Sequence, residues 1–147
     1  MSTGLRELRV WQESVALAGD VVRALRGSVK RETKVISDRV MLTALDISDH
    51  IAEGYGRHHA VEQRESYIAA KCALLRLESE LAVARHADLV AAGVFTEICA
   101  RGNQVARLLT GYLVYLERQI AEREPASTHP AAASPASSTR GSVRAPS

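Results

Sequence analysis

The prolines are confined to one end of the chain, and this constrains the fold more than any other feature of the sequence. The chain has 4 prolines, all from residue 125 onward: Pro125, Pro130, Pro135 and Pro146. Proline inside a helix costs about 3 kcal/mol. A long proline-free stretch rich in Ala, Leu, Arg and Glu is therefore typical of helices. We predict a helical domain over residues 1–124.

Residues 125–147 have a different composition. They are mainly Ala, Ser, Pro, Thr and Gly, with Arg140 and Arg144 and no acidic residue. Such a segment has too little apolar surface to offset the entropy lost on ordering, so we predict a disordered tail. The full chain carries 19 Lys and Arg against 17 Asp and Glu. Because two of the arginines belong to the tail, the helical domain has no net charge.

Glycines divide the helical domain into four segments. Gly27, Gly54, Gly56 and Gly93 lie where the apolar periodicity breaks, as expected at helix C-termini. Between them, apolar residues recur in steps of three and four, the period of an amphipathic helix. The four stripes are Leu8, Trp11, Val15, Ala18, Val22 and Leu25; Ile36, Val40, Ala44, Ile47 and Ile51; Tyr67, Ala70, Leu74, Leu77, Leu81 and Ala84; and Val94, Ile98, Val105, Leu109, Tyr112, Leu116 and Ile120. Strand signals are missing from the sequence. We predict an all-α fold, an antiparallel up-down-up-down four-helix bundle.

The third segment carries a second apolar stripe beside the first: Ile68, Cys72, Leu75 and Ala82. A helix that is apolar on more than one face needs a second partner to bury it, so we predict self-association. A thick core within one chain is the alternative.

The sequence also predicts the cellular setting. It has no apolar run near the roughly 20 residues that span a bilayer, and its N-terminus lacks the pattern of a signal peptide. We therefore expect a cytoplasmic protein without membrane contact. The cysteines Cys72 and Cys99 are expected to be free, buried thiols.

Polar residues gather near the end of the second segment: Asp46, Asp49, His50 and Glu53. Their spacing places Asp46, His50 and Glu53 on one helix face. A solvated face with ion pairs is favoured over a metal site, because the sequence lacks the Glu-x-x-His pattern of di-metal bundles. Motifs for a nucleophile elbow, a phosphate loop or paired cysteines are also missing. We predict a protein that is not an enzyme and uses no cofactor or metal.

Two basic groups are candidates for contact with nucleic acid. Lys30, Arg31 and Lys34 lie between the first two segments, and Arg57, His58 and His59 follow the second. Such groups neutralise phosphates, and repetition in a ring would multiply the effect. A solvated charged surface is the alternative, because Glu32 interrupts the first group and the domain has no net positive charge.

Several short motifs resemble a known family. They are residues 8–12 (LRVWQ), 51–57 (IAEGYGR), Glu62, 67–70 (YIAA) and 77–81 (LESEL). Together they resemble the bacterial four-helix-bundle family that includes proteins encoded in intervening sequences of large-subunit ribosomal RNA genes. The resemblance covers about residues 5–120. It implies a homopentameric ring and a non-enzymatic protein whose cellular role is poorly defined.

A related group of bundle proteins, the accessory determinants of diversity-generating retroelements, forms basic pentamers that bind nucleic acid and a reverse transcriptase. The resemblance therefore implies RNA or DNA as a partner. Here Met41 and Leu42 stand where the family usually has two arginines, which makes the surface less suited to phosphate. The alternative function is a structural or adaptor oligomer that binds a protein partner.

The motif residues Trp11, Glu53, Gly54, Gly56 and Arg57 are first expected to have structural roles. Trp11 would anchor the first helix in the core. Gly54 and Gly56 would permit a turn with positive φ. Glu53 and Arg57 would cap helix ends, pair with each other or contact a neighbouring subunit. Nucleic-acid contact is the alternative role for Arg57.

Overall fold

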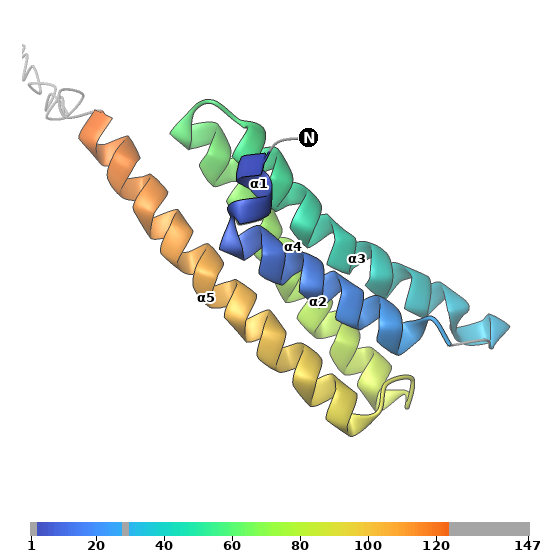
Figure 1. Ribbon diagram of the computed structural model, residues 1–147. Helices are drawn as coiled ribbons and strands as arrows, with labels where there is room; N and C mark the ends of the chain where they lie inside the picture. Colours follow the sequence, from blue (N-terminus) through green and yellow to red (C-terminus); the bar gives the residue numbers. More distant parts are fainter. Residues whose placement is uncertain (1–2, 28–29, 124–147) are drawn as a thin grey trace, which may run out of the picture.

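The computed structural model describes residues 3–27 and 30–123, and it confirms the all-α prediction. Five helices follow one another along the chain: α1 (Thr3–Glu7), α2 (Arg9–Leu25), α3 (Arg31–Gly56), α4 (Ala60–His86) and α5 (Ala92–Arg123) (Figure 1). Within the described ranges no residue is in a strand. The predicted tail, residues 125–147, lies outside the described residues.

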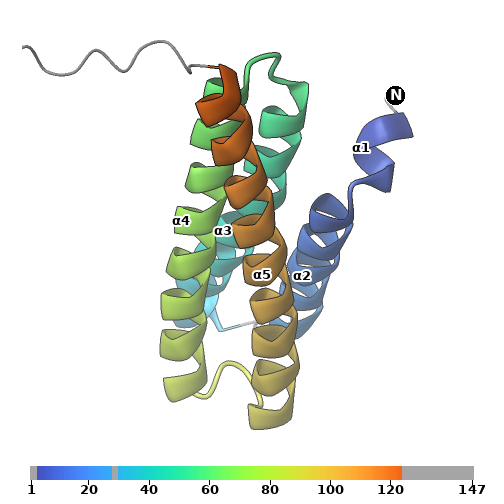
Figure 2. The same ribbon diagram turned by 90° about the vertical axis from the view of Figure 1, so that its left-hand side faces the viewer.

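The helix α1 is a short N-terminal helix that the apolar pattern did not predict, in addition to the four predicted ones. Leu8 separates it from α2 because its backbone is extended, with φ −73° and ψ 110°. The chain then starts a new helix, in which the N–H of Gln12 donates to the carbonyl of Leu8 at 3.0 Å. Figure 2 shows α1 standing to one side of the four long helices.

Each long helix packs against two others. α3 contacts α2 and α4, and α5 contacts α4 and α2. Figure 2 shows the four helices side by side, with the α3–α4 link at one end and the α4–α5 link at the other. The core lies between them. Its largest fully buried side chains are Leu17, Val21, Leu25, Val40, Ile47, Ile51, Tyr67, Leu77, Ile98, Val105, Leu109 and Leu116. All six residues of the stripe predicted to begin at Tyr67 are buried.

The core face of α2 is shifted from the predicted one. Its buried residues are Val10, Ser14, Leu17, Ala18, Val21 and Leu25. Trp11 is half-buried and packs against the edge of the core, and Val15 is 41% exposed. The prediction overlooked Ser14 because serine is polar. The Ser14 hydroxyl donates to the Trp11 carbonyl at 2.7 Å, so a backbone group of the same helix satisfies the hydrogen-bonding need of this buried side chain.

Gly54 is needed for close packing, and the predicted turn with positive φ is wrong. Neither Gly54 nor Gly56 has a positive φ, and Gly54 is buried near the end of α3. A Cβ on Gly54 would lie 3.0 Å from Cε2 of Tyr67 and 3.1 Å from Cβ of Ser66. The glycine therefore lets α3 approach α4.

The prediction that Gly93 ends a helix is wrong, because Gly93 lies in the first turn of α5. The helix before it ends at His86, and Asp88 follows with a φ of 61°. Aspartate adopts this left-handed conformation more readily than most residues. The N–H of Leu89 then donates to the carbonyl of Ala84 at 2.9 Å, which closes the end of α4.

Candidate functional site

The helix α4 is apolar on two opposite faces. Val61, Ile68, Leu75 and Ala82 recur at intervals of seven along its outside, with Cys72 between them. All five are exposed, and Leu75 is 59% exposed. We call these five residues the outer stripe. The inner face of α4 meets the core, so the described part of the chain buries only one of the two faces.

The outer stripe contains the whole second stripe predicted from the sequence. The expectation that Cys72 is buried is wrong, because its side chain is exposed, whereas Cys99 is half-buried. Both thiols are free. A repeat of seven residues keeps one face of a helix turned toward a second helix, as in a coiled coil. The pattern therefore suits a helical partner.

An apolar groove of about 310 Å³ lies beside the outer stripe, between α3 and α4. Val35 on its rim is 69% exposed, and Val83 opposite is exposed as well. Arg39 donates from Nε to Oε1 of Glu80 at 3.2 Å across the groove. The other oxygen, Oε2 of Glu80, is buried without a hydrogen-bond partner among the described residues. This surface extends the uncovered apolar area onto α3.

The two predicted basic groups lie at opposite ends of α3. Lys30 precedes the first residue of α3, and Arg57 follows the last. At 1.5 Å per residue these ends are about 39 Å apart. One chain therefore does not bring the two groups together.

The chemistry of the two groups also differs. In the first, Lys34 is paired with Asp38 at 2.7 Å, while Arg31 is exposed at the start of α3. In the second, Arg57, His58 and His59 are exposed in the link between α3 and α4. The second group thus offers a compact set of basic side chains at one end of the molecule.

The polar cluster at the end of α3 makes two separate polar contacts. Arg76 of α4 pairs with Asp46 at 3.2 Å, and Nδ1 of His50 lies 3.2 Å from Oε2 of Glu53. Glu53 thus contacts His50 on the same helix face, while the ion pair between Arg76 and Asp46 agrees with the solvated face predicted from the sequence. The described residues contain no group of three or more His, Cys, Asp and Glu side chains placed to share a metal ion.

The backbone of Arg57 ends α3 and joins it to α4. Its N–H donates to the carbonyl of Gly54 at 3.2 Å. Its own carbonyl accepts a hydrogen bond from Nε2 of Gln63 at 2.8 Å. The side chain of Arg57 is exposed, while its backbone fixes the geometry of the link.

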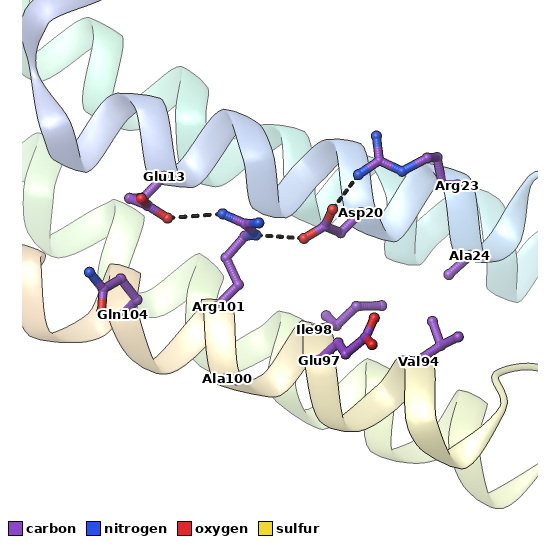
Figure 3. A pocket seen from close by; sticks show the side chains of 10 residues that line it. All are labelled: Glu13, Asp20, Arg23, Ala24, Val94, Glu97, Ile98, Ala100, Arg101 and Gln104. Carbon is purple, nitrogen blue, oxygen red and sulfur yellow. Dashed lines mark hydrogen bonds and ion pairs between the residues drawn. The ribbon is translucent and has the colours of Figure 1, made fainter.

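A groove of about 690 Å³ between α2 and α5 holds a charge network that the sequence did not reveal (Figure 3). Arg101 of α5 donates from Nε to Oδ2 of Asp20 at 2.6 Å and from Nη1 to Oε2 of Glu13 at 3.1 Å. Arg23 pairs with the same aspartate from within α2. The network therefore ties α5 to α2 through two carboxylates.

The network is suited to holding helices together. The hydrogen bond to Asp20 is the main cause of the raised pKa of Arg101, so the guanidinium stays charged. Glu13 and Asp20 are two helical turns apart, a spacing visible in the sequence. Their partner is 81 residues beyond Asp20 and becomes a neighbour only through folding.

Comparison with known proteins places the chain in a family. The family described as 23S rRNA-intervening sequence protein matches residues 6–111. The matched span reaches from α1 into α5 and includes the outer stripe, Gly54 and the Arg101 network. No curated protein matches the chain. None of the described helices is long and apolar enough to cross a membrane. Since the matched residues make up well over half of the sequence, the chain belongs to the 23S rRNA-intervening sequence protein family.

Proposed function

We propose that this protein is a non-catalytic cytoplasmic protein that assembles with copies of itself. Its four long helices form an antiparallel bundle, and the bundles join into the homopentameric ring that the family resemblance implies. The single observation that carries this proposal is the outer stripe of α4, a regular apolar face that the described chain leaves uncovered.

Burial of this face would supply a substantial driving force. Moving a Val, Leu or Ile side chain fully out of water contributes about 1.5–3 kcal/mol, and the stripe holds three such residues that are at least two-fifths exposed: Val61, Ile68 and Leu75. A ring needs two different surfaces that fit each other. Val35 and Leu42 on α3, both more than half exposed, supply a second apolar surface next to the first.

Nucleic acid is the partner that we propose for the assembled protein. A ring would repeat Arg57, His58 and His59 around one end, so that the exposed basic side chains of several chains act on the same phosphate backbone. The second candidate function is an adaptor that binds another protein. It is favoured by the ion pair between Lys34 and Asp38, which neutralises part of the other basic group.

The assembly is tested by light scattering on a size-exclusion column. We expect the unaltered protein to have a mass near five chains, and Leu75→Lys to reduce it to one chain with an unchanged helical circular dichroism spectrum. Val114→Lys is the matched control, because it charges another exposed apolar residue away from the stripe. A single-chain mass for the unaltered protein would refute the assembly.

The partner is tested in the same experiment with a short structured RNA at low and high salt. A mass increase with RNA at low salt that disappears at high salt supports nucleic-acid binding, because phosphate contacts release counterions. An assembled protein that ignores RNA and the matching DNA would instead favour the adaptor.

A further inference from the structure

A small apolar cavity of about 110 Å³ lies between α4 and α5, which run side by side (Figure 1). Its floor is formed by Leu17 of α2, Leu77 of α4 and Ile98 of α5, each at most 2% exposed. Leu75 of the outer stripe forms part of its edge. The cavity thus reaches from the outer surface down to the core.

Small side chains on α5 leave this space open. Cys99, Gly102 and Ala106 face the cavity at intervals of three and four residues. A glycine inside a helix costs about 1 kcal/mol relative to alanine. A Cβ on Gly102 would meet only Cδ1 of Leu74 at 3.9 Å, an ordinary contact. The packing of the chain itself therefore does not require glycine here.

The mouth of the cavity has one charge of each sign. Lys71 and Glu78 lie two helical turns apart on α4, and Asn103 faces them from α5. Burial raises the pKa of Cys99, with a smaller contribution from the charge of Glu78, so its thiol is protonated at neutral pH. The interior of the cavity is consequently uncharged.

We propose that the α4–α5 cavity binds a small uncharged molecule that carries a single aromatic ring or a branched alkyl group. An apolar cavity of about 150 Å³ stays dry and takes up benzene. The space here is smaller, about 110 Å³, but it opens to the outer surface, so it suits a group of about four to six heavy atoms with the rest of the molecule at the mouth. A charged group would lose its hydration inside this apolar space without a charged partner there, because Lys71 and Glu78 lie at the mouth. Because Leu75 of the outer stripe forms part of the cavity edge, the proposed assembly would lie beside its mouth, and the tests below distinguish a bound small molecule from a side chain of a second copy.

The test follows the thiol of Cys99, with toluene as the probe. Cys72→Ser leaves Cys99 as the thiol to be labelled. Cys99→Ser leaves Cys72 of the outer stripe as the control, compared with and without toluene at one protein concentration. At a toluene concentration ten times Kd, one cavity in eleven stays free, so labelling of Cys99 should slow about tenfold. Labelling of Cys72 should not change. Benzoate and benzylamine at the same concentration should protect Cys99 less.

The second measurement is the Tm of a variant in which a larger side chain fills the cavity. Gly102→Leu should raise Tm and abolish the increase in Tm that toluene causes. Gly111→Leu is the matched control, since a Cβ at that exposed position of α5 has no neighbour within 4 Å. This variant should keep the full response to toluene.

Three results would overturn the proposal. One is the absence of any effect of toluene on Cys99 labelling and on Tm. Another is a toluene response that persists in Gly102→Leu. The third is protection of Cys99 that needs no toluene and grows with protein concentration, because a side chain from a second copy would then be the occupant.

Discussion

At position 54 a single hydrogen atom determines how closely two helices pack. Gly54→Ala should lower the free energy of unfolding by about 1–2 kcal/mol, because the new Cβ would press on the ring of Tyr67, 3.0 Å away. Gly56→Ala is the control. Its Cβ would have no neighbour within 4 Å, so the better helix former should raise stability by up to about 1 kcal/mol. Urea unfolding compares the two, and equal effects would contradict the packing role of Gly54.

The hydroxyl of Tyr67 is a polar group inside the core. It is buried and makes no hydrogen bond within ordinary geometric limits to a described residue. The ring itself packs against Tyr112, with centroids 4.8 Å apart. Burial, assisted by the neighbouring Tyr112 hydroxyl, raises the pKa of Tyr67 well above its usual range. Tyr67→Phe keeps the ring contact, so stability at pH 7 should change by less than about 0.5 kcal/mol or increase.

The raised pKa of Tyr67 also predicts a pH dependence. The unfolded chain releases this proton near pH 10, whereas the folded chain retains it. The contribution of this proton to the free energy of unfolding is therefore fully present below about pH 10. It declines as the pH rises further, by about 1.4 kcal/mol per pH unit. Tyr67→Phe should lack this part of the decline. Urea unfolding at pH 8 and pH 11 measures it, and the same decline in both proteins would show that Tyr67 ionises in the folded state.

At the level of the helices, the sequence predicted α4 better than α2. The inner stripe of α4, from Tyr67 to Ala84, is buried as predicted, because its steps of three and four residues keep it on one face of the helix. In α2 the apolar residues are contiguous around the helix, and periodicity alone cannot distinguish Val15 from Leu17. Leu17 is buried and Val15 is exposed because of the way α2 packs against α3 and α5. The same limit applies to Gly54, whose partner Tyr67 lies on another helix.

The seam between α2 and α5 joins the two long helices that are farthest apart in the sequence, and Arg101 connects them. Arg101→Met keeps the aliphatic part of the side chain but leaves Glu13 without this partner. We expect a loss of about 1 kcal/mol, a modest value because the side chain of Arg101 is 36% exposed. The loss should shrink at high salt. Arg107→Met is the control, since its hydrogen bond to Gln104 stays within α5. Equal losses in the two variants would show that the network does not hold the seam.

Across the whole molecule, the length of α3 separates the two basic groups, and this separation predicts how nucleic acid would bind. Ends about 39 Å apart present different surfaces to a ligand. At the α3–α4 link three basic residues are consecutive and exposed, whereas at the other end Glu32 interrupts the group and Lys34 pairs with Asp38. Arg57→Gln should therefore weaken RNA binding for all sequences. It should also reduce the slope of log affinity against log salt by about 1 for each phosphate that the protein no longer neutralises.

Arg31→Gln, at the opposite end of α3, is the matched control, and it should leave both the affinity and the salt slope unchanged. Fluorescence anisotropy with a labelled RNA over a range of salt concentrations measures both quantities. If both variants weakened binding equally, a single RNA would have to span the length of α3, and the ligand would run along the helices.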